Sequence, residues 1–155
     1  MIFILIKVKG VTYFEKTFTK IPLHVQDFQK LKMLLDELVQ DGIMFIEGLS
    51  KYSLDISSKK SKVTINLRSE FSPDPYLAIT AINITPSNQG KGSIVLEWFK
   101  TFAKEKGFER LVLQEVITEE GYHFALKNGF SKKVGPFAEI FRKPDSNDGN
   151  YELHL

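Results

Sequence analysis

Hydrophobic and polar positions along the first part of the chain alternate in a way that predicts two strands and then a helix. Two β-rich runs occupy residues 2–9 and 11–18, and Gly10 between them is compatible with one bent strand or with a hairpin. After Pro22, apolar residues recur with a period of about 3.6 residues until Gly42. This period predicts a helix that buries one face, with the proline near its start and the glycine at its end.

The middle of the chain has the pattern of an antiparallel meander. Strand-like segments lie at residues 43–47, 52–57 and 63–68, and the polar turn at residues 58–61 joins the last two. Residues 76–84 return to alternating β character after a proline-bounded loop. These segments predict neighbouring strands of one sheet.

The second half alternates between helices and strands. We expect elements at residues 93–106 (helix), 111–116 (strand), 119–127 (helix), 134–142 (strand) and 151–155 (strand). The whole order predicts a single α/β (α+β) domain over residues 1–155, with a mixed, mostly antiparallel central sheet and helices on both of its faces.

Composition narrows the classes of function. The chain has 155 residues, 43% of them hydrophobic and 26% charged, which is typical of a globular protein. It has no cysteine, which excludes disulfides, thiolate metal sites and a cysteine nucleophile, and makes a reducing cytoplasm the expected location. A net charge of +2 gives no support for nucleic-acid binding, and no apolar run approaches the roughly 20 residues that span a membrane.

The turn between the strand at residues 76–84 and the next helix is the segment whose residues most clearly indicate a binding site. The first N–H groups of a helix have no partner within the helix, and the helix dipole adds positive potential there. Gly90 and Gly92 lack side chains that would keep an anion from these amides, and Lys91 adds a positive charge. The alternative is structural, with Asn88 or Ser93 capping the helix and the glycines only permitting a tight turn.

Residues of this turn resemble the acyl-CoA-binding motif of the GNAT superfamily of N-acyltransferases, Q/R-x-x-G-x-G/A. Gln89, Gly92 and the preceding Pro86 match the motif in type and spacing, whereas Ile94 occupies its last small position. Residues 122–130 are similar to the last helix of the family, which commonly ends in Gly-Phe as this segment does. The resemblance covers most of the chain and is strongest between residues 77 and 130.

The resemblance implies a GNAT-like domain that uses acetyl-CoA or another acyl-CoA and no metal. It implies that the main chain near Ile82 and Ile84 pairs with the pantetheine arm. It also implies that the pyrophosphate binds the amides of Gln89, Gly90, Lys91, Gly92 and Ser93. The acceptor would be an amine on a small molecule or a protein, and the oligomeric state stays open, with a homodimer as one option.

Candidate catalytic groups are less clear than the cofactor motif. Many members of the family carry a tyrosine that protonates the leaving thiolate, and the matching position here holds Ala125. Tyr122, three residues earlier on a similar helix face, is a candidate replacement and equally a packing aromatic. Glu115 is the nearest candidate for a general base, although charged residues at strand ends are usually only solvated.

Two functions therefore compete. The first is an acyl-CoA-dependent N-acyltransferase in which the amine attacks the thioester directly. The second is a noncatalytic member of the same fold that binds CoA or a protein partner, because a shared fold does not fix an activity. The residues Ala125 and Ile94, which depart from the family pattern, motivate the second. His24, His123 and His154 are separated in sequence and give no case for a metal site.

Overall fold

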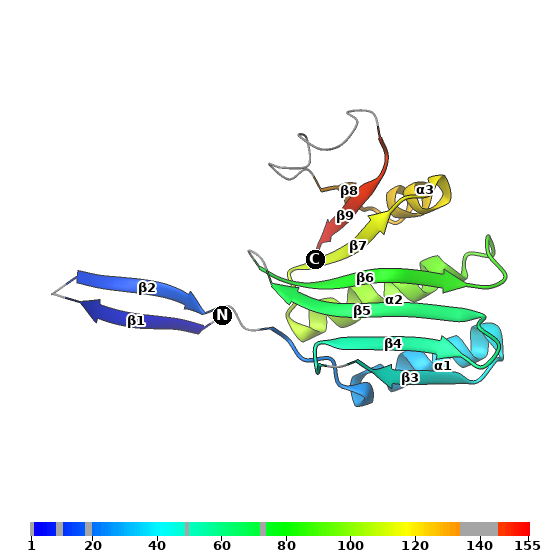
Figure 1. The fold of residues 1–155 in the computed structure, drawn as a ribbon, viewed down its shortest axis with the longest axis horizontal. Helices are drawn as coiled ribbons and strands as arrows, with labels where there is room; N and C mark the ends of the chain where they lie inside the picture. The colour runs from blue at the N-terminus through cyan, green and yellow to red at the C-terminus, as the bar shows by residue number, and fades with distance from the viewer. Residues whose placement is uncertain (1, 9–10, 18–19, 49, 72–73, 134–145) are drawn as a thin grey trace.

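A computed structural model describes residues 2–8, 11–17, 20–48, 50–71, 74–133 and 146–155. The chain begins with an antiparallel hairpin of β1 (Ile2–Val8) and β2 (Val11–Thr17), in which Val8 pairs with Val11. This settles the alternative at Gly10 in favour of a hairpin over one bent strand. The hairpin forms a sheet of its own and stands apart from the main sheet (Figure 1).

The main sheet has seven strands in the order β3-β4-β5-β6-β7-β9-β8. β6 and β7 are parallel, and the other neighbouring strands are antiparallel. The predicted mixed, mostly antiparallel sheet is confirmed. Its strands are β3 (Ile43–Glu47), β4 (Ser53–Ser58), β5 (Val63–Phe71), β6 (Pro75–Ile84), β7 (Arg110–Val116), β8 (Ser131–Lys132) and β9 (Gly149–His154).

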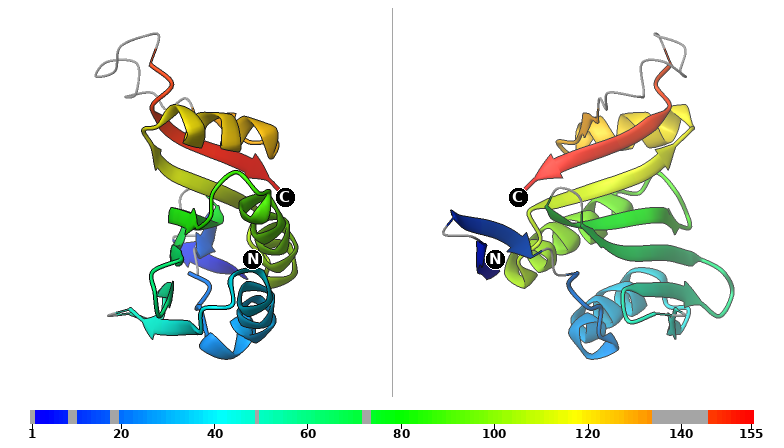
Figure 2. Two further views of the ribbon diagram at one scale, coloured as in Figure 1. Left: turned by 90° about the vertical axis from the view of Figure 1, so that its right-hand side faces the viewer. Right: turned by 60° about the vertical axis from the view of Figure 1, so that its left-hand side comes forward.

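The helices of the described chain are η1 (Val25–Phe28, a 3-10 turn), α1 (Gln29–Val39), α2 (Lys91–Lys106) and α3 (Glu119–Lys127). α1 and α2 lie side by side behind β3 to β6 in Figure 1, and the left panel of Figure 2 places them on the same side of the sheet. Over these strands α1 and α2 therefore cover the same face of the sheet. The connection from α1 to β3 spans only residues 40–42, which leaves no room for a second helix.

The helix boundaries follow local backbone chemistry. α1 ends at Gln40, which is left-handed with φ 49° and donates its N–H to the carbonyl of Asp36. α2 begins at Lys91, two residues before the predicted start at residue 93, because Gly90 adopts φ 74° and turns the chain into the helix. Gly107, at φ 87°, ends α2 as predicted.

The C-terminal part of the sheet was only partly predicted. β9 lies between β7 and β8, so the last strand inserts into the sheet instead of extending its edge. The short strand β8 was not predicted, because two residues carry no readable period. The strand predicted at residues 134–142 lies outside the described residues.

Aromatic side chains fill the core between the sheet and the two helices. Phe28 is fully buried, and its ring centroid lies 4.6 Å from that of Phe102, 5.9 Å from that of Trp98 and 6.4 Å from that of Phe45. Trp98 and Phe102 stack with an interplanar angle of 13°. One ring of η1 therefore joins α2 to β3 across the core.

Asp41 organises the turn between α1 and β3 together with the turn between β4 and β5. Its carboxylate accepts hydrogen bonds from Ser58 Oγ at 2.6 Å and from the N–H of Lys60 at 2.9 Å. Ser58 Oγ in turn accepts from the N–H of Val63 at 3.0 Å. The hydrogen bond from Ser58 is the main cause that lowers the pKa of Asp41 below its usual value.

We expect Phe28→Ala to lower the free energy of unfolding by about 3–5 kcal/mol, because it removes the ring that packs against three neighbours. Met33→Ala on the exposed face of α1 is the matched control and should change it by less than about 0.5 kcal/mol. Urea unfolding of both variants checks this. Equal losses in the two variants would contradict the described core.

We expect Asp41→Asn to weaken the fold at neutral pH and to reduce its acid sensitivity. A carboxylate whose folded pKa is lowered stabilises the fold above its unfolded pKa of about 4, and that contribution disappears as the pH falls through the folded pKa. The stability difference between wild type and variant should therefore shrink below about pH 4. Urea midpoints at pH 7 and pH 3 measure it, and a difference independent of pH would contradict the assignment.

Candidate functional site

β6 and β7 separate halfway along β6. Their parallel pairing runs from Tyr76 opposite Arg110 to Ile79 opposite Leu113 and ends there. β6 nevertheless continues to Ile84 and remains paired on its other side with β5, as far as Ile84 opposite Val63. Residues 81–84 thus have a strand partner on the β5 side and no register partner on β7, which leaves main-chain groups facing the gap.

Irregularities on both strands accompany this separation. The register between β5 and β6 shifts after Asn66. Asn66 pairs with Ala81 and the next residue, Leu67, pairs with Ile79, so Thr80 is the extra residue of a β-bulge. The register between β7 and β9 shifts between Leu113 and Val116. Both changes lie where the two parallel strands part, and a bulge bends the strand that carries it and increases its twist.

The N-terminus of α2 lies next to the gap. The first helical hydrogen bond runs from the N–H of Ile94 to the carbonyl of Gly90, at 3.2 Å. The amides of Lys91, Gly92 and Ser93 precede it, and the end of the helix has no side-chain cap. The N-cap position is held by Gly90, and not by the Asn88 or Ser93 of the capping alternative, so the first amides of α2 have no partner within the helix.

A cleft of about 580 Å³ joins the gap to the end of α2. All seven residues that the sequence assigned to a cofactor line it: Ile82, Ile84, Gln89, Gly90, Lys91, Gly92 and Ser93. The opposite wall comes from α3 and the residue just before it, including Thr118, Gly121, His123, Phe124 and Lys127. The cleft therefore lies between two helices and the free edge of a strand.

The two glycines of the turn have different roles. A Cβ on Gly90 would meet nothing within 4 Å, so space does not require a glycine here. The left-handed backbone of Gly90 favours one, and the residue lines the cleft. A Cβ on Gly92 would lie 3.1 Å from the ring of Phe124, so this glycine allows α3 to approach α2. The sequence indicates that both glycines allow an anion to approach, and the structure gives Gly92 a packing role as well.

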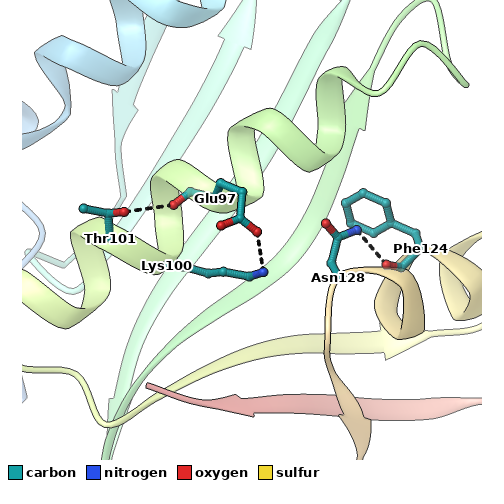
Figure 3. Close-up of polar contacts among 5 residues, drawn as sticks. All are labelled: Glu97, Lys100, Thr101, Phe124 and Asn128. Atoms are coloured by element: carbon teal, nitrogen blue, oxygen red, sulfur yellow. Dashed lines mark hydrogen bonds and ion pairs between the residues drawn. The ribbon is translucent and has the colours of Figure 1, made fainter.

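The C-terminal end of α3 is fixed by the side chain of the residue that follows it. Asn128, which is buried, donates from Nδ2 to the carbonyl of Phe124 at 2.8 Å. Figure 3 shows this bond beside α2, where Glu97 accepts from Lys100 and, through its carbonyl, from Thr101. The hydrogen bond holds the turn of α3 that carries Phe124 against the cleft.

Charges around the cleft favour an anionic ligand. Lys91 lies at the start of α2 and Lys127 on α3, and Glu120 is the carboxylate among the lining residues. The positive end of the α2 dipole adds to the two ammonium groups. Within the described residues no cluster of His, Asp and Glu could hold a metal ion, and no described helix has the length and apolar composition of a membrane span.

The candidate catalytic residues lie away from the cleft lining. Tyr122 packs on the core, with its ring 6.0 Å from that of Tyr151. Glu115 is exposed on β7, adopts φ 53°, and its N–H donates to Asn150 Oδ1 at 3.0 Å. Ala125, at the position of the family tyrosine, is fully buried. The structure thus brings the cofactor candidates together and leaves both catalytic candidates outside the cleft.

Sequence reasoning missed His123 and its neighbours on α3 as lining residues. His123 is exposed, and its Nε2 lies 3.6 Å from Oε1 of Glu119. The signal that could have identified it is topological, because a right-handed crossover from β7 places the following helix beside α2. The small residue Gly92 on α2 opposite an aromatic residue on α3 is a second such signal.

Comparisons with known proteins give matches among solved structures only. No protein-family model matches the chain, and neither does any curated protein. A GNAT family acetyltransferase from Elizabethkingia anophelis with acetyl-CoA bound is 14% identical over 73% of this chain and 97% of that chain, with a TM-score of 0.48. An acetyltransferase from Bacillus subtilis in complex with CoA is 12% identical over 73% and 97%, with a TM-score of 0.49.

An N-acetyltransferase from Thermoplasma acidophilum in complex with coenzyme A is 18% identical over 84% of this chain and 74% of that chain, with a TM-score of 0.47.

Proposed function

We propose that this protein binds acetyl-CoA or another acyl-CoA and transfers the acyl group to an amine in the cytoplasm. The observation that carries the proposal is the cleft itself, in which the free edge of β6 and the unpartnered amides of α2 face the same space. The free edge of β6 suits an extended arm that carries amide groups, and the amides of α2 suit phosphate. CoA contains both.

The described residues fit the parts of CoA one by one. The amides of Lys91, Gly92 and Ser93 would bind the pyrophosphate, as helix N-termini commonly do. The main chain at residues 81–84 would pair with the pantetheine arm as an added strand does. Lys127 would bind a further phosphate from the opposite wall. The volume of about 580 Å³ lies in the range of small-molecule sites.

The chain would contribute binding and orientation to the reaction. When bound, acetyl-CoA supplies a thioester with an electrophilic carbonyl carbon. The amine loses a proton and forms the C–N bond, the C–S bond breaks, and the sulfur leaves with its electron pair and takes up a proton. Fixing the reacting groups close together can lower such a barrier by several kcal/mol. His123, which lines the cleft, is the side chain that we assign to proton transfer.

A noncatalytic CoA-binding module is the second candidate function, and a specific observation favours it. Ala125 is buried where a tyrosine is common in the family, and neither Tyr122 nor Glu115 lines the cleft. A protein of this kind would keep the cofactor cleft and lack turnover.

Ser93→Glu tests the cofactor site. A carboxylate in the first turn of α2 would occupy the anion position while favouring the helix by about 0.3–1 kcal/mol. Acetyl-CoA at about 100 times its dissociation constant should stabilise the wild type by about 2.7 kcal/mol and leave the variant unchanged, as measured by thermal unfolding. Thr101→Glu adds the same charge to the exposed middle of α2 and should keep the response. A ligand response retained in Ser93→Glu would contradict the site.

Release of the CoA thiol in the presence of a panel of amines separates the two candidate functions. We expect turnover by the wild type and a fall of about tenfold or more in kcat for His123→Gln, with acetyl-CoA stabilisation unchanged. His154→Gln, exposed on β9, is the matched control and should retain full turnover. Stabilisation by acetyl-CoA without thiol release from any amine would favour the noncatalytic module.

A further inference from the structure

A second hollow lies on the face of the sheet opposite α1 and α2. It has a volume of about 630 Å³ and lies over β3 to β6. On its floor, Asp55, Asn66 and Arg68 alternate along β4 and β5 with the buried Leu54, Ile56, Ile65 and Leu67, so their side chains point away from the helices. The short connection from α1 to β3 leaves this face without a described helix, which is why polar side chains occupy it.

The floor presents hydrogen-bond acceptors in a fixed arrangement. Asp55 on β4 is paired in register with Asn66 on β5, and Asn66 Nδ2 donates to Asp55 Oδ1 at 2.6 Å. Because this bond uses the NH₂ of the amide, Asn66 Oδ1 is directed away from Asp55 and can accept from a ligand. Asp55 Oδ2 is a second acceptor beside it. An ammonium group, which has three donors and no acceptor, matches this pair of oxygens.

A guanidinium group lies one register pair further along the same strands. Arg68 follows Asn66 on the same face of β5, opposite Ser53, and its side chain is exposed. Its side chain has no hydrogen-bond or ion-pair partner within the described part of the chain. Lys20, the other cation of the hollow, already pairs with Glu70 at 3.0 Å. Arg68 is thus the cation positioned to bind a carboxylate, to which a guanidinium group donates two parallel hydrogen bonds.

The hollow reaches the point at which β6 and β7 separate. Thr80, the bulge residue of β6, lines the hollow, and Ile82 on the same strand lines the cleft. Ala81 between them is the register partner of Asn66. Asn66 therefore lies on the strand next to the segment of β6 that we assign to the acyl-bearing arm, and Asp55 lies one strand further away.

We propose that this hollow binds the acyl acceptor, and that the acceptor is an amine that also carries a carboxylate, the class of the free amino acids. The inference rests on the proposed function for its chemistry. The ammonium group lies at Asp55 and Asn66, and the carboxylate lies at Arg68. Loss of one proton to solvent frees the amine to form the C–N bond as the C–S bond breaks, which gives an N-acyl amino acid and the CoA thiol.

The test begins with binding, which needs no cofactor. Leucine and glutamate are titrated into the full chain, each beside its decarboxylated amine, while NMR follows the backbone amides of residues 66, 68 and 80 and the side-chain NH₂ of Asn66. We expect both amino acids to shift these signals at concentrations about tenfold or more below those of the amines. Arg68→Gln should abolish this difference, and Arg68→Lys should restore part of it. Lys60→Gln, on the turn between β4 and β5, is the control and should preserve it.

The outcomes separate this inference from the proposed function. Equal shifts from amino acids and amines, or none in the hollow, would overturn the amino-acid acceptor even when acetyl-CoA stabilises the protein. Amino-acid shifts that depend on Arg68 support the acceptor site even if acetyl-CoA fails to bind, in which case the proposed function alone would fall. With both ligands bound, Arg68→Gln should raise KM for amino acids about tenfold and leave acetyl-CoA stabilisation unchanged.

Discussion

The separation of β6 from β7 is the constraint on which the rest of the site depends. A parallel pair of strands normally satisfies the main-chain groups of both, and here the pairing ends at Ile79 and Leu113 while β6 continues to Ile84. Unpaired main-chain groups are costly when buried, so this edge must face solvent or a ligand that can hydrogen-bond with it. The cleft, the position of α2 and the approach of α3 all follow from that opening.

Two helices complete the opening, and each depends on a small local feature. Gly90 in a left-handed conformation turns the chain so that the first amides of α2 face the gap. Gly92 leaves space for the ring of Phe124, and the buried Asn128 holds the turn that carries this ring. The same stretch of β6 that borders the cleft is next to Asn66 on its other side. A ligand at Asn66 and a cofactor at the free edge therefore lie on opposite sides of β6.

Much of the fold was predictable from the sequence, because it depends on local periods. The hydrophobic pattern predicted β-structure at residues 2–18, α1, the meander of β3 to β5 and the stretch from β6 to α3, and the glycine turn predicted the free amides at α2. What the sequence could not predict depends on distant contacts. The insertion of β9 between β7 and β8, the bulge at Thr80 and the placement of His123 in the cleft all arise from how strands and helices pack. The positions of Tyr122 and Glu115 outside the cleft also depend on this packing, and the sequence could not predict them.

Amide hydrogen exchange with and without saturating CoA tests the central claim most directly. If the free edge of β6 and the first turn of α2 bind the cofactor, exchange should slow in two separate segments, residues 81–84 and residues 91–93, and stay unchanged in β3 and β4. Protection confined to other strands, or no protection in residues 81–84 at saturation, would contradict the account.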